Sequence, residues 1–487
     1  MTLAVDLPPV TPARGALLAA AVPLVVDLDG TLLRTDTLLE SLLDLARLHP
    51  ADLLRVPLWL AQGRARLKHH LARRAPLDAR TLPLAHDLLE HLRAQKRQGR
   101  RLILATGADA AVAHAMADEL GLFDAVIASD GTTNLTATHK RDRLVAEFGE
   151  RGFDYVGNSA RDLPVWAAAR RAVLVAPAPR VAAAARRVTE VERTFDAAPA
   201  RAGTWLAAMR VHHWLKNLLL LVPLLAAHRL YEPAMLANAA IGGFAFCLAA
   251  SGVYLLNDLL DLRADRRHPH KRERVLASGR MPIEHALALL PLLWLAAALL
   301  GAALPRPFLA ALGTYVGLML VYSVRLKDIA IVDAFALAAG YTLRILAGAI
   351  AVGMDVSPWL LVSSVALFFG LALLKRYAEL VTLRGSLGPG ARVRAYRVTD
   401  AALIAALGLA AGCVAVALLA LYPVAVPSLH AGWPVWLVGG LLLFWTGHMW
   451  LMAHRGRIRD DPVVFALRDP LSRVFGLLTA AVLVLSA

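Results

Sequence analysis

An Asp-rich stretch follows directly after an apolar run at residues 236–256. It contains Asn257, Asp258, Asp261, Asp265, Lys271 and Arg274. The three carboxylates are three and four residues apart, which places them on one face of the helix if that helix continues. Alone they would repel one another, whereas Mg²⁺ with a bound diphosphate suits several oxygen ligands beside Lys and Arg. The spacing therefore predicts a Mg²⁺-diphosphate site, and the competing interpretation is a solvated loop of mixed charge between two membrane helices.

Strand-like segments in the N-terminal part, at 23–26, 101–107, 125–129 and 153–159, alternate with helical ones. This alternation predicts a doubly wound α/β domain, in which ligands bind at the carboxyl ends of the strands. The polar residues at or beyond these ends are Asp27, Asp29, Thr106, Lys140, Asn158 and Asp162. Two carboxylates, a hydroxyl and an ammonium with a metal ion are suited to phosphoryl transfer.

Three further segments have distinct patterns. Residues 36–99 repeat leucines at helical spacing, which predicts a helical cap over the α/β site with Trp59 in its core. Residues 175–204 are rich in Ala and Arg, and we expect a linker there. Residues 205–217 mix aromatic, basic and apolar side chains, as is typical of a helix at a membrane surface. We therefore expect one domain at 1–204 and another at 205–487.

The second domain is strongly apolar, in a chain that is 58% hydrophobic and only 18% charged. Its apolar stretches are each long enough to cross a bilayer. They lie at about 215–231, 234–256, 283–302, 306–324, 330–352, 356–376, 400–422, 432–454 and 470–487. This pattern predicts an all-α polytopic membrane bundle of about nine transmembrane helices.

The net charge of +15 is distributed as a membrane protein would have it. Four alternate loops of the membrane part carry nineteen Lys and Arg, whereas the loops on the other side carry only Arg229 and Arg306. By the positive-inside rule the four basic loops and the N-terminal domain are cytoplasmic, at an inner membrane, and the C-terminus is extracytoplasmic. No aromatic-interleaved basic surface indicates nucleic-acid binding. The two cysteines, Cys247 and Cys413, lie in apolar runs at no metal or redox spacing.

Residues 22–177 resemble the haloacid-dehalogenase-like phosphatases through the strand that leads into Asp27-x-Asp29-Gly-Thr. The resemblance implies that Asp27 is a nucleophile that forms an aspartyl-phosphate and that Asp29 is the general acid and base. It also implies that Thr106 holds phosphoryl oxygens, Lys140 neutralises charge, and Asp162 joins the two aspartates at Mg²⁺. The chain has Asn158 where the family usually has Asp. Asn can still bind Mg²⁺ or its water, but a domain kept only for regulation or assembly is the alternative.

The membrane half resembles the UbiA-type superfamily of intramembrane prenyltransferases, because the Asp-rich stretch follows the second of nine spans. That superfamily binds a diphosphate through Mg²⁺ and aspartates, here Asp258, Asp261 and Asp265. One branch, the polyprenyl-phosphate phosphoribosyltransferases, resembles this chain further in four motifs. They are Arg210-x-x-His-Trp-x-Lys216-Asn217, Tyr322-Ser-x-x-Leu-Lys327, Lys375-Arg376-Tyr377-Ala-Glu379-Leu, and Asp461-Pro-x-x-Phe-x-x-x-Asp469.

The second Asp-rich motif of the usual aromatic prenyltransferases is reduced here to Asp328 and Asp333. The resemblance therefore implies transfer of 5-phosphoribose from phosphoribosyl diphosphate to a polyprenyl phosphate, after which the phosphatase-like domain removes a phosphate. The alternative is prenyl transfer from an isoprenyl diphosphate to an aromatic or other acceptor.

Basic and polar residues near the span ends are the expected contacts of the substrate phosphates. Arg344 lies inside the fifth span, where a buried guanidinium is costly unless it meets a partner such as a phosphate. The expected substrate-binding residues are Lys216, Asn217, Asn257, Lys271, Arg274, Tyr322, Lys327, Arg344, Lys375, Arg376, Tyr377 and Glu379.

Overall fold

The computed structural model describes residues 22–196, 202–227, 229–355, 357–387, 392–393, 395–425, 432–458 and 462–485. The chain divides into two compact units. The first comprises Met1–Ala208 with Asp258–Ala288, and the second comprises Met209–Asn257 with Leu289–Ala487. The Asp-rich stretch from Asp258 onward therefore belongs to the same unit as the N-terminal domain.

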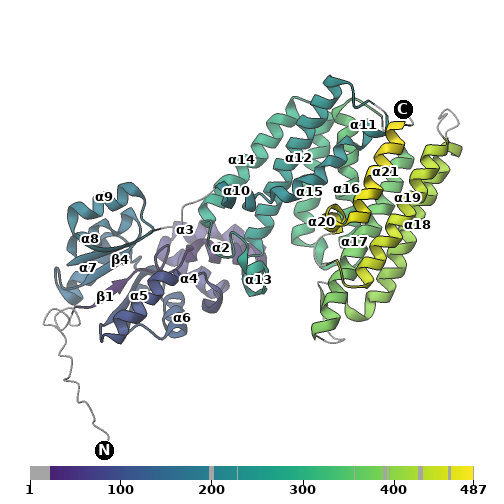
Figure 1. The fold of residues 1–487 in the computed structure, drawn as a ribbon. Helices are drawn as coiled ribbons and strands as arrows, with labels where there is room; N and C mark the ends of the chain where they lie inside the picture. Colours follow the sequence, from purple (N-terminus) through teal and green to yellow (C-terminus); the bar gives the residue numbers. More distant parts are fainter. Residues whose placement is uncertain are drawn as a thin grey trace, which may run out of the picture. The chain divides into compact units, whose positions relative to one another are not determined.

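A six-stranded parallel sheet forms the centre of the first unit (Figure 1). Its strands are β1 (Leu24–Val26), β2 (Leu102–Asp109), β3 (Ala125–Ser129), β4 (Asp154–Gly157), β5 (Arg171–Val175) and β6 (Glu190–Phe195), in the order β3-β2-β1-β4-β5-β6. The order reverses direction between β1 and β4, which is where an open parallel sheet binds its ligands. The predicted α/β parallel sheet is confirmed.

The sheet is covered by helices on both faces because alternate strand residues point to opposite sides. Leu24 and Val26 pack with α5 (His86–Arg97) and α6 (Ala110–Leu120) in one core cluster. Val25 packs in the other cluster with α7 (Thr138–Phe148), α8 (Leu163–Ala168) and α9 (Pro179–Val188). Two buried layers therefore hold the carboxyl ends of the strands in place.

Most of the segment 36–99 forms a helical insertion with a small core of its own. Its elements are α2 (Thr37–Leu48), η1 (Pro50–Arg55), α3 (Val56–Ala61), α4 (Arg64–Arg74) and η2 (Ala79–Thr81). Leu45, Trp59 and Leu71 pack together in that core, as expected for Trp59. The last helix of the segment, α5, packs against the sheet instead, so the cap is shorter than predicted.

The predicted linker at 175–204 is wrong for most of its length. It contains α9 and β6, which complete the sheet, followed by α10 (Ala202–Ala208). Three of the six residues of β6, Glu190, Glu192 and Arg193, are exposed, because an edge strand is open on one side. Val191 and Phe195 still pack against the two cores, so the strand is anchored by only two apolar side chains.

The second unit is a bundle of helices (Figure 1). Its elements are η4 (Val211–Leu221), α11 (Val222–Ala226), α12 (Pro233–Leu260), α14 (Ile283–Ala302), α15 (Pro307–Val324), η6 (Leu326–Asp328), α16 (Val332–Ala351), α17 (Pro358–Leu387), β7 (Arg392–Val393), β8 (Tyr396–Arg397), η7 (Val398–Asp400), α18 (Ala401–Ala425), α19 (Gly432–His454), α20 (Pro462–Arg468) and α21 (Pro470–Leu485). Helices α12 and α14 cross the boundary between the units, and α13 (Leu262–Arg267) and η5 (Lys271–Glu273) lie between them in the first unit.

Seven helices within the described residues are long and apolar enough to span a membrane: α12 and α14 to α19. The first and last of the nine expected spans correspond to shorter apolar helices, Val211–Ala226 and Pro470–Val482. The count of nine therefore stays a prediction, and the helical membrane-type architecture is confirmed.

Candidate functional site

The switch point of the sheet holds a buried cluster of polar side chains. Lys140, at the start of α7, donates from Nζ to Asp27 Oδ1 at 2.7 Å and to the Tyr155 hydroxyl at 2.9 Å. The Tyr155 hydroxyl in turn donates to Asp162 Oδ1 at 2.9 Å. The structure thus brings together three residues from distant predicted motifs. Tyr155 was not among the expected site residues, because a tyrosine in a buried strand cannot be told from an ordinary core residue by its position in the sequence.

Asp162 closes the loop that follows β4. Its Oδ2 accepts hydrogen bonds from the backbone N–H of Asn158 at 3.1 Å and of Ser159 at 3.0 Å, and from the Ser159 hydroxyl at 3.1 Å. Both of its oxygens are therefore engaged in shaping the loop. The arrangement makes Asp162 a positioning group for Asn158 and Lys140, while its expected contact with Mg²⁺ remains a prediction.

Burial changes the acidity of the two aspartates after β1. It raises the pKa of Asp27 to about 6 from 3.8, against the lowering effect of the Lys140 ammonium. It raises the pKa of Asp29 to about 7, helped by the charge of Asp36 and opposed by hydrogen bonds from Thr37. Thr37 donates to Asp29 from its backbone N–H at 2.9 Å and from its hydroxyl at 3.2 Å. A pKa near 7 suits a group that must both give and take a proton.

The loop that contains Gly30 packs closely against the side chain of Asn158. Gly30 has φ +70°, and a Cβ there would lie 2.2 Å from Nδ2 of Asn158. The amide of Asn158 therefore packs directly against the loop that carries Asp27 and Asp29. Within the described residues no three His, Cys, Asp or Glu side chains gather as a metal site. Two carboxylates and one amide still suit Mg²⁺, since this ion is often held by one or two carboxylates plus substrate phosphates.

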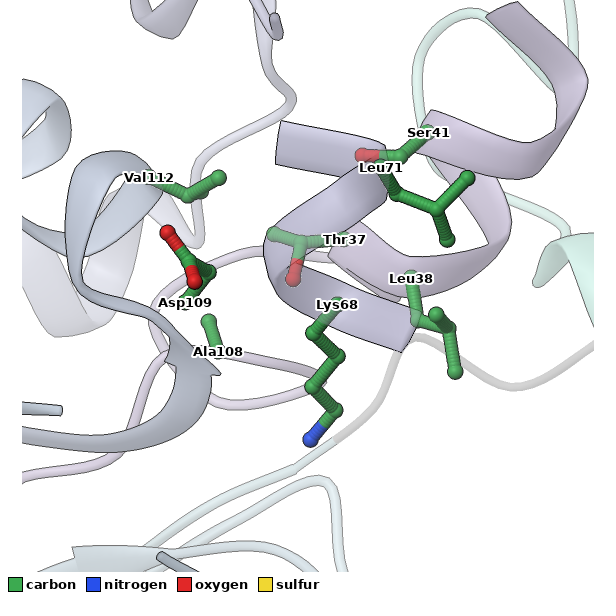
Figure 2. Close-up of a pocket in the computed structure, with 8 residues that line it drawn as sticks. All are labelled: Thr37, Leu38, Ser41, Lys68, Leu71, Ala108, Asp109 and Val112. Atoms are coloured by element: carbon green, nitrogen blue, oxygen red, sulfur yellow. The ribbon is translucent and has the colours of Figure 1, made fainter. Parts of the chain in front are cut away.

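The cap contacts the core beside this cluster. Lys68 of α4 donates from Nζ to Gly107 O at 2.5 Å and to Asn134 Oδ1 at 2.9 Å, and burial lowers its pKa. His69 lies 3.1 Å from Asp109 between ring Nδ1 and Oδ2. Figure 2 shows the resulting pocket, with Lys68 on the cap side and Asp109 on the core side. The pocket is lined by Thr37, Leu38, Ser41, Lys68, Leu71, Ala108, Asp109 and Val112. The sequence predicted a cap here, with Trp59 in its core, but assigned no cap residue to the site.

Thr106, the remaining expected residue of this unit, lies fully buried in β2. Its hydroxyl accepts a hydrogen bond from the backbone N–H of Ala108 at 3.0 Å. It lies three residues before the end of β2, the strand next to β1, and its contact with a phosphoryl group remains a prediction.

The Asp-rich stretch folds differently from the continuous helix expected. Helix α12 ends at Leu260, and Asp261 caps the short helix α13. Asp258 and Asp265 nevertheless meet, because Arg274 donates from Nη1 to Asp258 Oδ1 at 3.2 Å and to Asp265 Oδ2 at 2.6 Å. Asp261 instead forms an ion pair with Arg47 of the cap. Lys271 is exposed, and Asn257 is half-buried at the end of α12.

Arg344 of α16 is buried in the second unit, and each of its three guanidinium nitrogens donates a hydrogen bond. It donates to Asn217 Oδ1 at 2.7 Å, to Gly340 O at 2.7 Å and to the Tyr315 hydroxyl at 2.9 Å. The rings of Tyr315 and Tyr341 also face its guanidinium. Its burial therefore does not by itself require a substrate phosphate. Tyr315 had no sequence signal beyond its place in an apolar run.

Arg376 of α17 is the centre of a second buried network. It donates to Asp333 Oδ2 at 2.7 Å, to Glu379 at 2.8 Å and to the Tyr322 hydroxyl at 3.2 Å. Asp333 is fully buried and also accepts a hydrogen bond from the hydroxyl of Tyr396. Three expected site residues, Tyr322, Arg376 and Glu379, are thus brought together. Their partner Asp333 was expected only as part of the reduced second Asp-rich motif.

The remaining expected residues of the second unit have contacts of their own, and one of them, Lys216, lies over the same Tyr341 ring as Arg344. Tyr377 is hydrogen-bonded to His454 Nδ1 at 2.8 Å, and Lys216 lies 5.7 Å from the ring centre of Tyr341. Lys327 is buried and Lys375 is half-buried. Of the last motif, Asp469 lies 3.0 Å from His448 Nε2, and Asp461 is outside the described residues.

Comparison with known proteins gives the same picture for the membrane half. A model of the UbiA prenyltransferase family matches residues 198–469. The chain is 35% identical to the uncharacterized protein y4nM of Sinorhizobium fredii, over 95% of this chain and 91% of that protein. It is 36% identical to the nodulation protein NoeC of Azorhizobium caulinodans, over 56% of this chain and 89% of that protein.

Two further similarities are more distant. A decaprenyl-phosphate phosphoribosyltransferase of Corynebacterium glutamicum is 35% identical over 36% of this chain and 54% of its own length. A solved UbiA homolog from Archaeoglobus fulgidus, bound to DMAPP and Mg²⁺, has a TM-score of 0.45 and 17% identity, covering 58% of this chain and 97% of that one.

Proposed function

The chain belongs to the UbiA prenyltransferase family, and from this premise we propose that it transfers 5-phosphoribose from phosphoribosyl diphosphate to a polyprenyl phosphate. Family membership makes it a membrane transferase, and the choice of donor and acceptor is our proposal. The similarity to decaprenyl-phosphate phosphoribosyltransferases supports this choice.

One observation carries the choice of donor. Among the described residues of the two Asp-rich motifs, Asp258 and Asp265 converge on Arg274 and form an acidic cluster. The carboxylate of Asp333, which remains from the second motif, is fully buried and bound by Arg376 and Tyr396. A buried carboxylate that is already paired with an arginine is costly to expose to a second cation. The arrangement therefore favours a donor that needs one acidic cluster over an isoprenyl diphosphate held by two.

The residues of the acidic cluster fit Mg²⁺. Two carboxylates that share the Arg274 guanidinium are hard oxygen donors, and Asp261 lies between them in the sequence, at the junction of α12 and α13. These three aspartates would hold Mg²⁺, which supplies positive charge for the departing diphosphate. Arg274, which contacts both carboxylates, would bind the same diphosphate oxygens. An oxygen of the lipid phosphate attacks C1 of the ribose, the bond from C1 to the diphosphate breaks, and the diphosphate leaves.

We propose that the N-terminal domain is a phosphatase of the haloacid-dehalogenase type that acts on the lipid-linked product. The 2.7 Å contact between Lys140 and Asp27 supports this, because the ammonium keeps a buried carboxylate charged enough to act as nucleophile. Asp27 attacks phosphorus while Asp29, protonated near neutral pH, gives its proton to the leaving oxygen. Asp29 then takes a proton from the water that hydrolyses the aspartyl-phosphate.

The transferase proposal is tested with radiolabelled phosphoribosyl diphosphate, polyprenyl phosphate, Mg²⁺ and purified protein. Label should enter the organic phase, and Asp258→Asn should lower the rate by about 100-fold or more, since it removes an electrostatic contact made in the transition state. The matched control is Asp328→Asn, an exposed aspartate of the reduced second motif, which should leave transfer near normal.

Two results would favour prenyl transfer instead. One is the absence of lipid-bound label together with prenylation of an aromatic acid. The other is loss of activity in Asp328→Asn as large as in Asp258→Asn, since a donor held by two acidic clusters needs both.

A further inference from the structure

Helix α2 of the cap carries a row of four polar side chains on one face. They are Thr37, Glu40, Asp44 and Arg47, spaced three, four and three residues apart. At 3.6 residues per turn this spacing keeps them within one face of the helix. Leu38, Leu42 and Leu45 take the cap-core side. The polar row is therefore directed away from the core to which α2 belongs.

The middle of this row holds a buried ion pair with the Asp-rich loop. Glu40 accepts two hydrogen bonds from Arg266 of α13, at 2.9 Å and 2.6 Å, and both side chains are only 5% exposed. Thr35 donates to the same carboxylate at 2.6 Å, and Arg266 also donates to Ala277 O at 3.0 Å. A charge pair this deeply buried is tolerated only when its geometry is good and its remaining hydrogen-bonding capacity is used. Here both conditions are met.

Further pairs extend the contact on either side. Asp44 lies 3.5 Å from Arg263 Nη1, and Arg267 donates to Asp78 at 2.6 Å. The backbones also come close, since a Cβ on Gly279, at φ +69°, would lie 2.8 Å from Cβ of Arg34. The contact thus involves three arginines of α13 and three carboxylates of the cap region, which is charge complementarity along a whole surface.

The two ends of the row reach the two candidate sites. At the N-terminal end, Thr37 binds the carboxylate of Asp29 through its backbone N–H and its hydroxyl. At the C-terminal end, Arg47 pairs with Asp261 and donates from Nη1 to Leu260 O at 3.0 Å. Helix α2, which has twelve residues, therefore contacts the proposed acid of one site, Asp29, and an aspartate of the other, Asp261, within the first unit.

We infer that the polar face of α2 is a docking surface for the Asp-rich loop, and that Arg47 is a positioning residue for Asp261 of the transferase site. The role assigned to Asp261 rests on the proposed function, whereas the docking itself does not. The cap thereby serves the membrane reaction: it holds the loop that carries the aspartates and orients one of their carboxylates. Arg47 acts through Asp261 and makes no contact with the reacting atoms.

Hydrogen exchange of the loop 262–281 in the full-length protein tests the docking. Removing one partner of a buried ion pair leaves an uncompensated charge, so Glu40→Arg and Arg266→Glu should each speed exchange in this loop by about tenfold or more. The double variant Glu40→Arg with Arg266→Glu should restore most of the protection. The matched control is Arg55→Ala, which removes an exposed cap arginine that pairs with Asp52 and leaves Asp52 bound to Arg74. It should leave exchange in the loop unchanged.

Should Glu40→Arg disturb the cap itself, exchange in α4 would rise as well. Arg266→Ala then replaces it, because it changes only the loop side of the pair. Unchanged protection of the loop in Arg266→Ala, or no recovery in the double variant whose cap remains protected, overturns the docking.

The positioning role of Arg47 is tested by kinetics and by exchange together. Arg47→Ala should raise the KM for the diphosphate donor by about tenfold with a smaller change in kcat, and Arg47→Lys should recover part of the loss. Addition of Mg²⁺ and inorganic diphosphate should slow exchange at residues 258–265 in the wild type and less so in Arg47→Ala. Equal protection in both proteins overturns the positioning role. If no phosphoribose transfer is found but the loop still responds to Glu40→Arg, the proposed function falls and the docking stands.

Discussion

At the scale of single residues, the polar cluster at the switch point of the sheet consists of buried side chains that bind one another. Asp27, Lys140, Tyr155 and Asp162 form one chain of hydrogen bonds, in which each member positions the next. Such a chain is stable because every buried polar atom in it has a partner. It also makes the cluster sensitive to single substitutions, in ways that depend on which member is changed.

Replacing Asp27, the proposed nucleophile, should separate the proposed phosphatase activity from phosphoribose transfer. Asp27→Asn is nearly isosteric and removes the attacking carboxylate, so the phosphorylated lipid should accumulate while total lipid-linked ribose stays near normal. Thin-layer separation of the labelled lipids measures the ratio. Lys140→Ala should give a weaker block, since it removes charge stabilisation and no covalent bond.

An unchanged ratio of phosphorylated to dephosphorylated lipid in Asp27→Asn would mean that the domain acts on another substrate or has only a regulatory role. The double substitution with Asp258→Asn should leave no labelled lipid of either kind, which serves as the blank for the measurement.

The raised pKa of Asp29 predicts a pH-dependent stability. Its folded-state value of about 7 lies above the ordinary 3.8, so the folded state binds the proton more tightly than the unfolded state. Its contribution to stability is therefore full below about pH 4 and is lost as the pH rises through about 7. In EDTA, Asp29→Asn should raise Tm at about pH 8 and change it little at about pH 4. Exposed Asp118→Asn is the control, and a gain confined to acid pH would contradict the assignment.

At the scale of elements, the loops after β1 and β4 decide whether the site forms at all. The first contains Gly30 at φ +70°, and the second brings Asn158 against it. The capping box of Ser159 and Asp162 holds the second loop in place. Only a residue without a Cβ fits where two loops approach this closely.

Gly30→Ala should therefore lower the free energy of unfolding by more than the positive φ at this position alone explains. Gly99 has a similar φ of +81° with nothing within 4 Å of an added Cβ, so Gly99→Ala isolates the backbone cost, about 1–2 kcal/mol. Gly30→Ala adds a clash with Nδ2 of Asn158 at 2.2 Å. Urea unfolding should show the larger loss in Gly30→Ala, and its phosphatase activity should fall more than its stability does. Equal losses in the two variants would mean that Asn158 moves aside freely.

At the scale of the whole molecule, the number of membrane crossings sets where the C-terminus lies. Helix α21 has 16 residues and so spans about 24 Å, less than the roughly 30 Å hydrocarbon core. The segment Val211–Ala226 has the same number of residues, and its first part, Val211–Leu221, is a 3₁₀ helix. Short spans can cross where the bilayer thins around them, and the distribution of Lys and Arg still favours nine crossings.

Accessible tags test this topology. Tags at residue 1 and in the loop 385–395 should be protected in intact cells, and a tag at residue 487 should be reached from outside. Permeabilised cells, in which all three tags react, provide the control. If the loop tag is protected, a protected C-terminal tag would mean that α21 does not cross, and an accessible tag at residue 1 would mean that Val211–Ala226 does not cross.

The sequence by itself determined the features that arise from local periodicity. Buried strands alternating with helices produce a parallel sheet. Polar residues at or beyond the strand ends then meet at its switch point, as Asp27 after β1 and Lys140 at the start of α7 do. Apolar runs of membrane length and basic loops likewise depend only on neighbours in the chain. For the same reason the sequence predicted a linker at β6. Its exposed Glu190, Glu192 and Arg193 are typical of a linker, and only the pairing with β5 makes the segment a strand.

Only the tertiary structure decided which charges are paired. Glu40 and Arg266 are 226 residues apart, and Asp333 and Arg376 are 43 apart, so no local pattern relates the two members of either pair. The same holds for Arg47, which the sequence offers only as a basic residue in the last turn of a helix. The energy of such pairs depends on burial and on the geometry of both partners, and these exist only once the chain has folded.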